Sequence, residues 1–393
     1  MTDQRALSRR HLLTLSAVAS AGAVLAPGVA QAQKKLPQVP RRMLGKTKQT
    51  VPILLVGGGM GFKGMDRRIE LALQYGANYI DTARKYAGGT SERDAGSTLR
   101  KLGARDKTWI TSKTEKWSAK GFAQDVAISL DTMKVKSIDL YFLHQLDEVA
   151  PLDDKELLQT VERLKKEGKI KFFGFSCHHG NVPELLHAAA QRSMVDAVMF
   201  RYNFRQYGDK ELNRAIDAAH KANVGLIAMK TQGAEAGFRD AWTKFEQTGK
   251  WNKYQSVLKA VWEDTRITAA VSHMTDLTQL RENIGAAVDR QKLGQLERDA
   301  LRRYAEVTRP YACHGCDHLC GSAIDAPVSV SRTLRSLTYH DAYGDPSKAR
   351  RVFAEQPAAA RRLEGVDFSR AAAACPHGVD IPALMQRAAR VLV

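Results

Sequence analysis

Four ionisable side chains of different types lie near the ends of short apolar segments in this 393-residue chain: Asp81, Tyr86, Lys113 and His144. A tyrosine hydroxyl titrates at about pH 10, so it needs a neighbouring cation to act as an acid or base at neutral pH. Lys113 can supply that cation, and Asp81 can keep the lysine charged. His144 can donate a hydrogen bond to a carbonyl oxygen and stabilise the negative charge that develops there during hydride addition. Together they predict a carbonyl-reducing site with Tyr86 as the general acid.

These side chains must be positioned by eight apolar segments, which alternate with longer amphipathic ones. The predicted strands are residues 53–57, 78–82, 109–112, 138–143, 170–175, 195–201, 224–229 and 268–271. Their nearly continuous apolar character is typical of parallel strands covered by helices. Eight units in about 250 residues predict a closed (β/α)8 TIM barrel, whose catalytic residues come from the C-terminal strand ends. A doubly wound sheet is disfavoured because the glycines of 57–61 lack the G-x-G-x-x-G spacing.

Three stretches of sequence share motifs with a known family: Asn78 to Tyr86 with the following Ser91-Glu92, Ser112-Lys113-Thr114, and Asp139 to His144. Through them, the region 42–287 resembles the aldo-keto reductases. The resemblance implies that Tyr86 donates a proton, that Lys113 and Asp81 tune it, and that His144 orients the carbonyl. It also implies NADP(H) or NAD(H) as the cofactor and a small-molecule carbonyl or alcohol as the substrate. Each residue taken alone has an ordinary structural role, so the prediction depends on their combination.

The cofactor side of the resemblance is less complete. The resemblance implies that Ser176 contacts the nicotinamide amide and that Glu282 and Asn283 contact adenine, while Lys230 is a candidate for the pyrophosphate or an exposed lysine. Several positions depart from the family pattern, namely Cys177, Met199 and Met229, and no obligate cation stands near His273 and Gln279, where a 2′-phosphate would bind. The sequence therefore leaves NADPH and NADH undecided.

Four of the five cysteines lie near the C-terminus: Cys313, Cys316, Cys320 and Cys375. Their C-x2-C-x3-C cluster and distant Cys-Pro resemble the ferredoxin-like tail of some aldo-keto reductases, which implies a 4Fe-4S cluster held by four thiolates. A regular ferredoxin run is more compact. Two disulfides are an alternative in an oxidising compartment, and zinc held together with His314, His318 or His377 is another. Cys177 is expected to be a buried thiol without a chemical role.

The N-terminus is predicted to be a twin-arginine export signal, which makes the export machinery a partner and the periplasm, or another exported location, the destination. Arg9 and Arg10 precede the apolar stretch 12–26, and Ala30 and Ala32 are the small residues that a signal peptidase requires. An uncleaved anchor is the alternative. The predicted division is a signal peptide (1–32), a linker (33–41), the barrel (42–301) and a helical, Cys-rich C-terminal extension (302–393).

The formal net charge of +18 raises the question of nucleic-acid binding. Basic residues are interleaved with acidic ones and no nucleic-acid motif is present, so we expect a solvated basic surface. The long loop 231–252 is a candidate substrate loop or a surface insertion. A rival hypothesis is an exported binding or electron-transfer module with an iron-sulfur tail, a redox partner and little nicotinamide-dependent activity.

Overall fold

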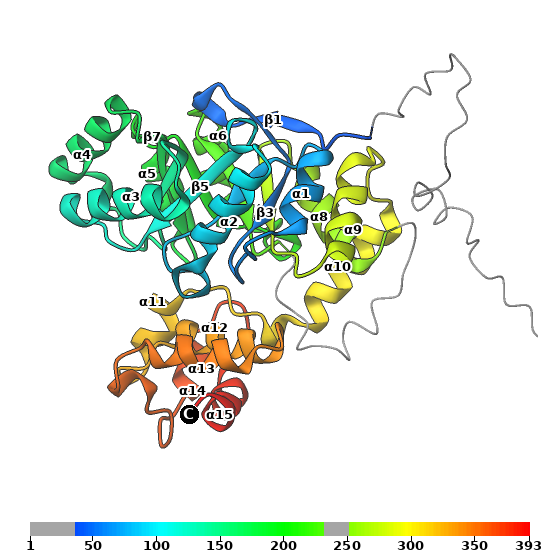
Figure 1. Ribbon diagram of the computed structural model, residues 1–393. Coiled ribbons are helices and arrows are strands. Elements are labelled where there is room, and N and C mark those ends of the chain that lie inside the picture. The colour runs from blue at the N-terminus through cyan, green and yellow to red at the C-terminus, as the bar shows by residue number, and fades with distance from the viewer. Residues whose placement is uncertain (1–35, 232–250) are drawn as a thin grey trace, which may run out of the picture. The chain divides into compact units, whose positions relative to one another are not determined.

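The computed structural model describes residues 36–231 and 251–393 (Figure 1). Residues 37–393 form one compact unit. The predicted export signal and nearly all of the predicted loop 231–252 lie outside the described residues.

Eight parallel strands close into a barrel in the order β10-β3-β4-β5-β6-β7-β8-β9. They are β3 (Leu54–Gly57), β4 (Tyr79–Asp81), β5 (Trp109–Thr114), β6 (Ile138–Leu143), β7 (Ile170–Cys177), β8 (Ala197–Arg201), β9 (Gly225–Met229) and β10 (Ala269–Ser272). The predicted TIM barrel is therefore confirmed, and each predicted strand overlaps its counterpart. The ladder pairs Asp81 with Thr111 and Lys113 with Phe142, which places the ends of β4, β5 and β6 beside one another.

The strands are apolar throughout because the barrel buries both of their faces. All six residues of β6 are buried. One set of side chains, including Tyr79, Leu140 and Ile227, fills the barrel interior, and a larger set packs between the strands and the surrounding helices. Gly174 in β7 has no room for a side chain, since a Cβ there would lie 1.9 Å from the carbonyl oxygen of Ala197.

Nine α-helices surround or flank the barrel in the described residues, with acidic or polar N-caps at most of them. They are α1 (Arg67–Gln74), α2 (Thr90–Lys101), α3 (Ala119–Met133), α4 (Lys155–Lys166), α5 (Val182–Ala190), α6 (Lys210–Lys221), α8 (Lys253–Glu263), α9 (Leu277–Val288) and α10 (Gln295–Val307). The expected boundary between barrel and extension, at 301–302, falls inside α10, which continues without a break.

A short hairpin was missed by the sequence analysis. Strands β1 (Arg41–Met43) and β2 (Thr50–Pro52) pair antiparallel, and β1 begins at the last residue of the predicted linker. Val51 and the adjoining Leu44 are fully buried among the side chains of the barrel interior. The hairpin thus closes one end of the barrel, and its three-residue strands are too short to give a periodic signal.

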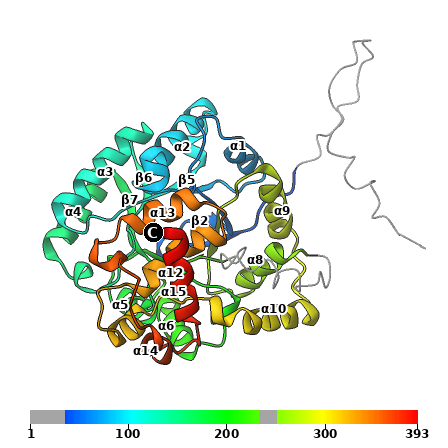
Figure 2. The same ribbon diagram turned by 90° about the horizontal axis from the view of Figure 1, so that it is seen from below.

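The C-terminal extension is helical, as predicted, and it lies against the carboxyl ends of the barrel strands (Figures 1 and 2). Its helices are α11 (Asp317–Cys320), α12 (Val330–Asp341), α13 (Pro346–Ala354), α14 (Ser369–Ala373) and α15 (Ile381–Leu392). They share an apolar cluster that includes Leu334, Phe353 and Met385. The extension thus has its own core and at the same time covers the end of the barrel where chemistry was expected.

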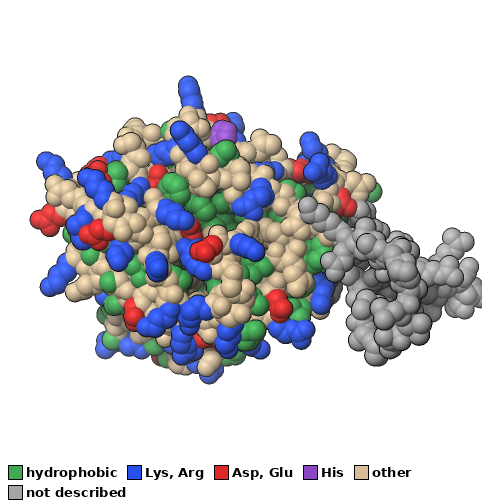
Figure 3. All heavy atoms as spheres, turned by 45° about the horizontal axis from the view of Figure 1, so that its top comes forward, with side chains coloured by type: hydrophobic (Ala, Val, Ile, Leu, Met, Phe, Trp, Pro, Cys, Tyr) green, Lys and Arg blue, Asp and Glu red, His purple; other side chains and the backbone are tan. Residues whose placement is uncertain are grey.

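Basic and acidic side chains are interspersed on the surface, as the sequence predicts. On the face seen in Figure 3, Lys and Arg side chains are scattered among fewer acidic ones and among apolar patches. Within the described ranges, no helix combines the length and the apolar character needed to cross a membrane.

Candidate active site

The structure brings the four predicted catalytic residues together at the carboxyl ends of β4, β5 and β6. The Lys113 Nζ atom lies 2.6 Å from Asp81 Oδ1 and also donates to the carbonyl oxygen of Thr82 at 2.7 Å. The same Nζ atom lies 4.9 Å from the centre of the Tyr86 ring, and the Tyr86 and His144 rings meet edge to face at 5.6 Å. Asp81, Tyr86 and His144 line one cleft, whereas Lys113 is not part of its lining.

Burial dominates the electrostatics of this group. Burial raises the pKa of Asp81 and lowers the pKa of Lys113, and each effect is opposed by the charge of the partner. Burial, followed by the charges of Lys113 and Arg335, lowers the pKa of His144 well below its ordinary value, so its imidazole is neutral at pH 7. A neutral imidazole can still donate one N–H to a carbonyl oxygen.

One expectation about Tyr86 was wrong. A neighbouring cation was expected to bring its pKa toward neutrality, yet burial and the charge of Asp81 raise the pKa of Tyr86 well above its ordinary value. The hydroxyl is therefore held protonated. The proton that a general acid needs is therefore present, but the raised pKa also makes the hydroxyl a weaker acid than a free tyrosine.

A buried carboxylate supports the group from behind. Glu92, in α2, is fully buried, accepts a hydrogen bond from Ser112 Oγ at 2.6 Å and pairs with Arg84 Nη1 at 2.6 Å. Ser112 precedes Lys113 in β5, and Arg84 precedes Tyr86 in the loop. Glu92 thus fixes the backbone on both sides of the predicted catalytic residues, a role that the sequence showed only as part of the family motif.

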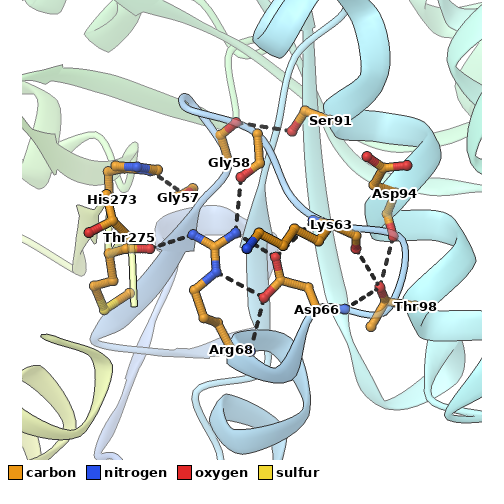
Figure 4. A network of polar contacts seen from close by, with 12 residues as sticks. Gly57, Gly58, Lys63, Asp66, Arg68, Ser91, Asp94, Thr98, His273 and Thr275 are labelled. Carbon is orange, nitrogen blue, oxygen red and sulfur yellow. Dashed lines mark hydrogen bonds and ion pairs between the residues drawn. The ribbon is translucent and has the colours of Figure 1, made fainter. Parts of the chain in front are cut away.

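The loop after β3 is held in place by a second network (Figure 4). Arg68 donates to Asp66 Oδ1 at 2.8 Å and, through its two terminal nitrogens, to the carbonyl oxygens of Gly61 at 3.0 Å and Met274 at 2.5 Å. His273 Nδ1 donates to the carbonyl oxygen of Gly57 at 3.0 Å. These bonds tie the loop after β3 to the loop after β10, so one wall of the cleft is rigid.

The cleft itself has a volume of about 1640 Å³. Its floor is the barrel rim, with Tyr86 and His144, and its roof comes from α12 and α13. Among the roof residues are Arg335, Tyr339 and Lys348, none of which the sequence analysis selected. In the sequence they resemble ordinary residues of amphipathic helices, and only the packing of the extension onto the barrel reveals their position.

The predicted cofactor residues divide into two groups. Lys230, Glu282 and Asn283 line the cleft, as do Met199, Met229, His273 and Gln279. Ser176 does not line it, because its hydroxyl is buried and accepts a hydrogen bond at 3.2 Å from the N–H of Gln145, in the loop after β6. The Nε2 atom of His273 is buried in the cleft wall and has no hydrogen-bond partner.

The four C-terminal cysteines meet around one small cavity. Cys313, Cys316, Cys320 and Cys375 line it together with His314, His377 and four aliphatic side chains. All four are free thiols, and Cys316 Sγ lies 3.4 Å from His377 Nε2. In the described part of the chain, no group of three or more His, Cys, Asp or Glu side chains converges as a site for a metal ion.

Cys177 is buried at the end of β7, where its Sγ atom lies 3.8 Å from the carbonyl oxygen of His179 and 3.8 Å from Asn181 Oδ1. Burial raises the pKa of this thiol to about 12. A thiol with so high a pKa is a poor nucleophile, which agrees with the structural role predicted for it.

Comparisons with known proteins point to one family. A family model described as "Aldo/keto reductase family" matches residues 58–309, which is more than half of the chain. A Gibberella moniliformis aldo-keto reductase is 28% identical over 182 residues, covering 44% of this chain and 54% of the relative. Methylglyoxal reductase of Escherichia coli is 33% identical over 136 residues, covering 32% of this chain and 46% of the relative. The alignments thus span about half the length of these curated relatives.

Solved structures share the fold. An aldo-keto reductase of Bacillus halodurans, in its holo form, aligns with a TM-score of 0.56 at 21% identity, covering 68% of this chain and 96% of that one. A putative aldo-keto reductase of Pseudomonas aeruginosa aligns with a TM-score of 0.51 at 23% identity, covering 65% of this chain and 96% of that one. At these identities the likeness supports the barrel fold.

The buried ion pair gives a stability prediction. Lys113→Met leaves the Asp81 carboxylate buried without its cation, so we expect the free energy of unfolding to fall by about 3–5 kcal/mol in urea denaturation. The double variant Asp81→Leu with Lys113→Met removes both charges and should recover much of this loss. The matched control is Lys116→Met, because the Lys116 side chain is 54% exposed in its pair with Asp125, and its loss should cost at most about 1 kcal/mol. A cost for Lys113→Met no larger than this control would contradict the prediction.

Proposed function

Because the chain belongs to the aldo/keto reductase family, we propose that it transfers hydride between a nicotinamide cofactor and a small-molecule carbonyl or alcohol. The observation that carries the proposal is the buried Lys113–Asp81 pair, 2.6 Å between charged atoms, beside the Tyr86 and His144 rings at the floor of a large cleft. Two curated relatives are named for reduction of methylglyoxal and of an aflatoxin B1 aldehyde. Their names support an aldehyde or ketone as the substrate class.

The proposed chemistry assigns one task to each side chain. Neutral His144 donates a hydrogen bond to the substrate carbonyl oxygen and orients it toward the Tyr86 hydroxyl. When bound in the cleft, a reduced nicotinamide would supply the hydride that the carbonyl carbon accepts. Tyr86 transfers its proton to the oxygen, and Lys113 stabilises the phenolate that remains. Asp81 keeps Lys113 charged and in position, so it acts as a positioning residue.

The cleft fits a dinucleotide in size and in chemistry. Its volume of about 1640 Å³ exceeds the roughly 300–1,000 Å³ of common small-molecule sites. Glu282 and Asn283 would hold the cofactor, and the unpartnered His273 Nε2 offers one more polar atom. Met199 and Met229 give the wall apolar surface where the family pattern has a polar and an aromatic residue.

Tyr86→Phe tests the proposal. We expect it to lower kcat for carbonyl reduction by about 10²–10⁴-fold, because the proton donor is lost while the cleft keeps its shape. NADPH and NADH binding, followed by fluorescence titration, should change little. Tyr75→Phe, outside the cleft, is the matched control. If the purified protein binds neither nucleotide and Tyr86→Phe leaves reduction unchanged, the rival binding or electron-transfer role replaces the proposed one.

The cysteine cavity supports a second proposal, that Cys313, Cys316, Cys320 and Cys375 hold a 4Fe-4S cluster. Four thiols around one apolar-lined cavity match the ligand set of such a cluster. The half-buried guanidinium of Arg201 donates to the carbonyl oxygen of Cys313 at 2.5 Å, and its positive charge would offset the negative charge of a thiolate-bound cluster. When bound, the cluster would supply one-electron transfer, which is the feature that the rival role requires.

Iron and acid-labile sulfide analysis of anaerobically purified protein tests the cluster. We expect about four iron and four sulfide per chain, lost on Cys316→Ser or Cys375→Ser. Cys177→Ser is the matched control and should retain the full content, because Cys177 lies apart from the cavity. Zinc in place of iron, or an intact mass showing two disulfides, would contradict the proposal and support the corresponding alternative.

Export through the twin-arginine pathway remains a proposal based on residues 1–32. Replacing Arg9 and Arg10 by Lys should leave the protein in the cytoplasmic fraction, because the paired arginines are what the pathway recognises. Cell fractionation followed by immunoblotting measures the distribution. An Arg5→Lys variant, outside the pair, serves as the control, and undiminished export of the Arg9/Arg10 variant would rule out this route.

A further inference from the structure

One part of the cleft, between its roof and the end of β9, brings together three cations and one tyrosine. Arg335 and Tyr339 come from α12, Lys348 from α13, and Lys230 from the end of β9. The Nζ atoms of Lys348 and Lys230 lie 4.6 Å and 5.8 Å from the centre of the Tyr339 ring. Arg335 donates to Gln145 Oε1 at 2.5 Å, one residue after His144.

These cations have no carboxylate partner within ion-pair distance among the described residues. Lys348 Nζ donates only to a neutral acceptor, the carbonyl oxygen of Gly59 at 3.2 Å, and lies 2.8 Å from Met60 Sδ. The Nε atom of Arg335 is buried and has no hydrogen-bond partner at all. Burying a cation without a counter-charge is costly, so the site is built to receive negative charge.

Three acidic residues of the cleft have other partners. Glu115 pairs with Lys85 at 2.7 Å, and Lys85 also lies 3.6 Å from Glu355. Asp345 accepts from the backbone N–H of Lys348 as the N-cap of α13. The positive charges of Arg335, Lys348 and Lys230 are therefore available to a ligand in the cleft.

Lys230 and Gln145, the hydrogen-bond partner of Arg335, have an unfavourable backbone conformation. Lys230 and Gln145 have φ values of 58° and 60°, in the left-handed region that residues with side chains rarely adopt. Such conformations cost on the order of 1–2 kcal/mol and cluster at functional sites. Here they aim Lys230, and the partner of Arg335, at the same part of the cleft.

We propose that Arg335, Lys348 and Lys230 form an anion-binding subsite, completed by the C-terminal extension, that holds a carboxylate or phosphate group of the carbonyl substrate. This proposal rests on the proposed reductase function and narrows its substrate class to anionic carbonyl compounds. The cofactor pyrophosphate carries the same chemistry and is the other source of an anion. The substrate is favoured because Arg335 donates to Gln145, the residue directly after His144, so this cation lies on the side of the cleft where the predicted catalytic residues are.

The first experiment compares two four-carbon aldehydes, succinic semialdehyde and butanal, of which the first has a carboxylate where the second has a methyl group. We expect the wild-type kcat/KM to favour succinic semialdehyde by at least about 10-fold, and Arg335→Met or Lys348→Met to reduce this preference by about 10- to 100-fold, mainly through KM. Arg362→Met is the matched control, because Arg362 is exposed on the extension and outside the cleft. Equal kcat/KM values for the two aldehydes in the wild type would overturn the proposal.

A second measurement separates the two sources of the anion. If the subsite serves the substrate, NADPH affinity in fluorescence titration should be similar in the wild type and in Arg335→Met. A parallel loss of NADPH affinity, with no carboxylate preference, would assign the cations to the cofactor and overturn the proposal.

Binding without turnover distinguishes failure of this subsite from failure of the reductase function. Succinate and inorganic phosphate are titrated calorimetrically into the wild type and Arg335→Met. Binding by the wild type alone supports the subsite even if no carbonyl is reduced. Absence of binding in the wild type overturns it even if butanal is reduced.

The pH dependence of succinate binding gives an independent readout. Burial raises the pKa of Tyr339, but the charges of Arg335, Lys230 and Lys348 outweigh burial and bring it down to about 7. The titratable and charged groups facing Tyr339 are Arg335, Tyr343, Lys348, Lys230 and Tyr86. Above its pKa the phenolate competes with the ligand for the cations, so succinate affinity should fall as the pH rises through about 7. Tyr339→Phe should remove this fall, and an unchanged pH profile would contradict the competition.

Discussion

The buried pair of Lys113 and Asp81 is the interaction on which the site depends. Two charges are held out of water at the end of a barrel strand, a placement whose desolvation cost is repaid only with close geometry and further hydrogen bonds. Both conditions are met, because the pair is 2.6 Å apart and Lys113 also donates to a backbone carbonyl. Parallel strands in fixed register supply the rigidity, and the buried Glu92 holds the flanking residues Ser112 and Arg84.

The extension changes what that barrel can bind. A TIM barrel presents its chemistry at the open carboxyl ends of its strands, and loops usually complete the site. Here α12 and α13 cover that end, and they contribute cations to the cavity they enclose. Positive charge near Tyr86 and His144 affects the pKa values of these residues. It also favours the binding of anionic ligands in the cleft.

The same extension connects the barrel rim to the cysteine cavity. Arg201, at the end of β8, donates to the carbonyl oxygen of Cys313, and the N–H of Gly180 donates to the carbonyl oxygen of Gly315 at 2.8 Å. Gly180 must be a glycine, since a Cβ there would lie 2.6 Å from Cys316 Cα. The cysteine loop is thereby seated on the barrel, so the two sites share one rigid boundary.

The sequence by itself determined the barrel, because the continuous apolar strands and amphipathic helices follow local periodicities that need no tertiary information. It also selected Asp81, Tyr86, Lys113 and His144 as one group, because their motifs lie at predicted strand ends, and the structure brings these four residues together. It could not place Ser176, which is buried against Gln145 of the loop after β6, nor fix the direction of the Tyr86 pKa shift, because burial is a property of the assembled site. The sequence could not identify Arg335, Tyr339 and Lys348 for the same reason. Only the tertiary structure decides that this face of the extension encloses the cleft. There, partial burial and the lack of a carboxylate partner make these ordinary helix residues a cluster of positive charge.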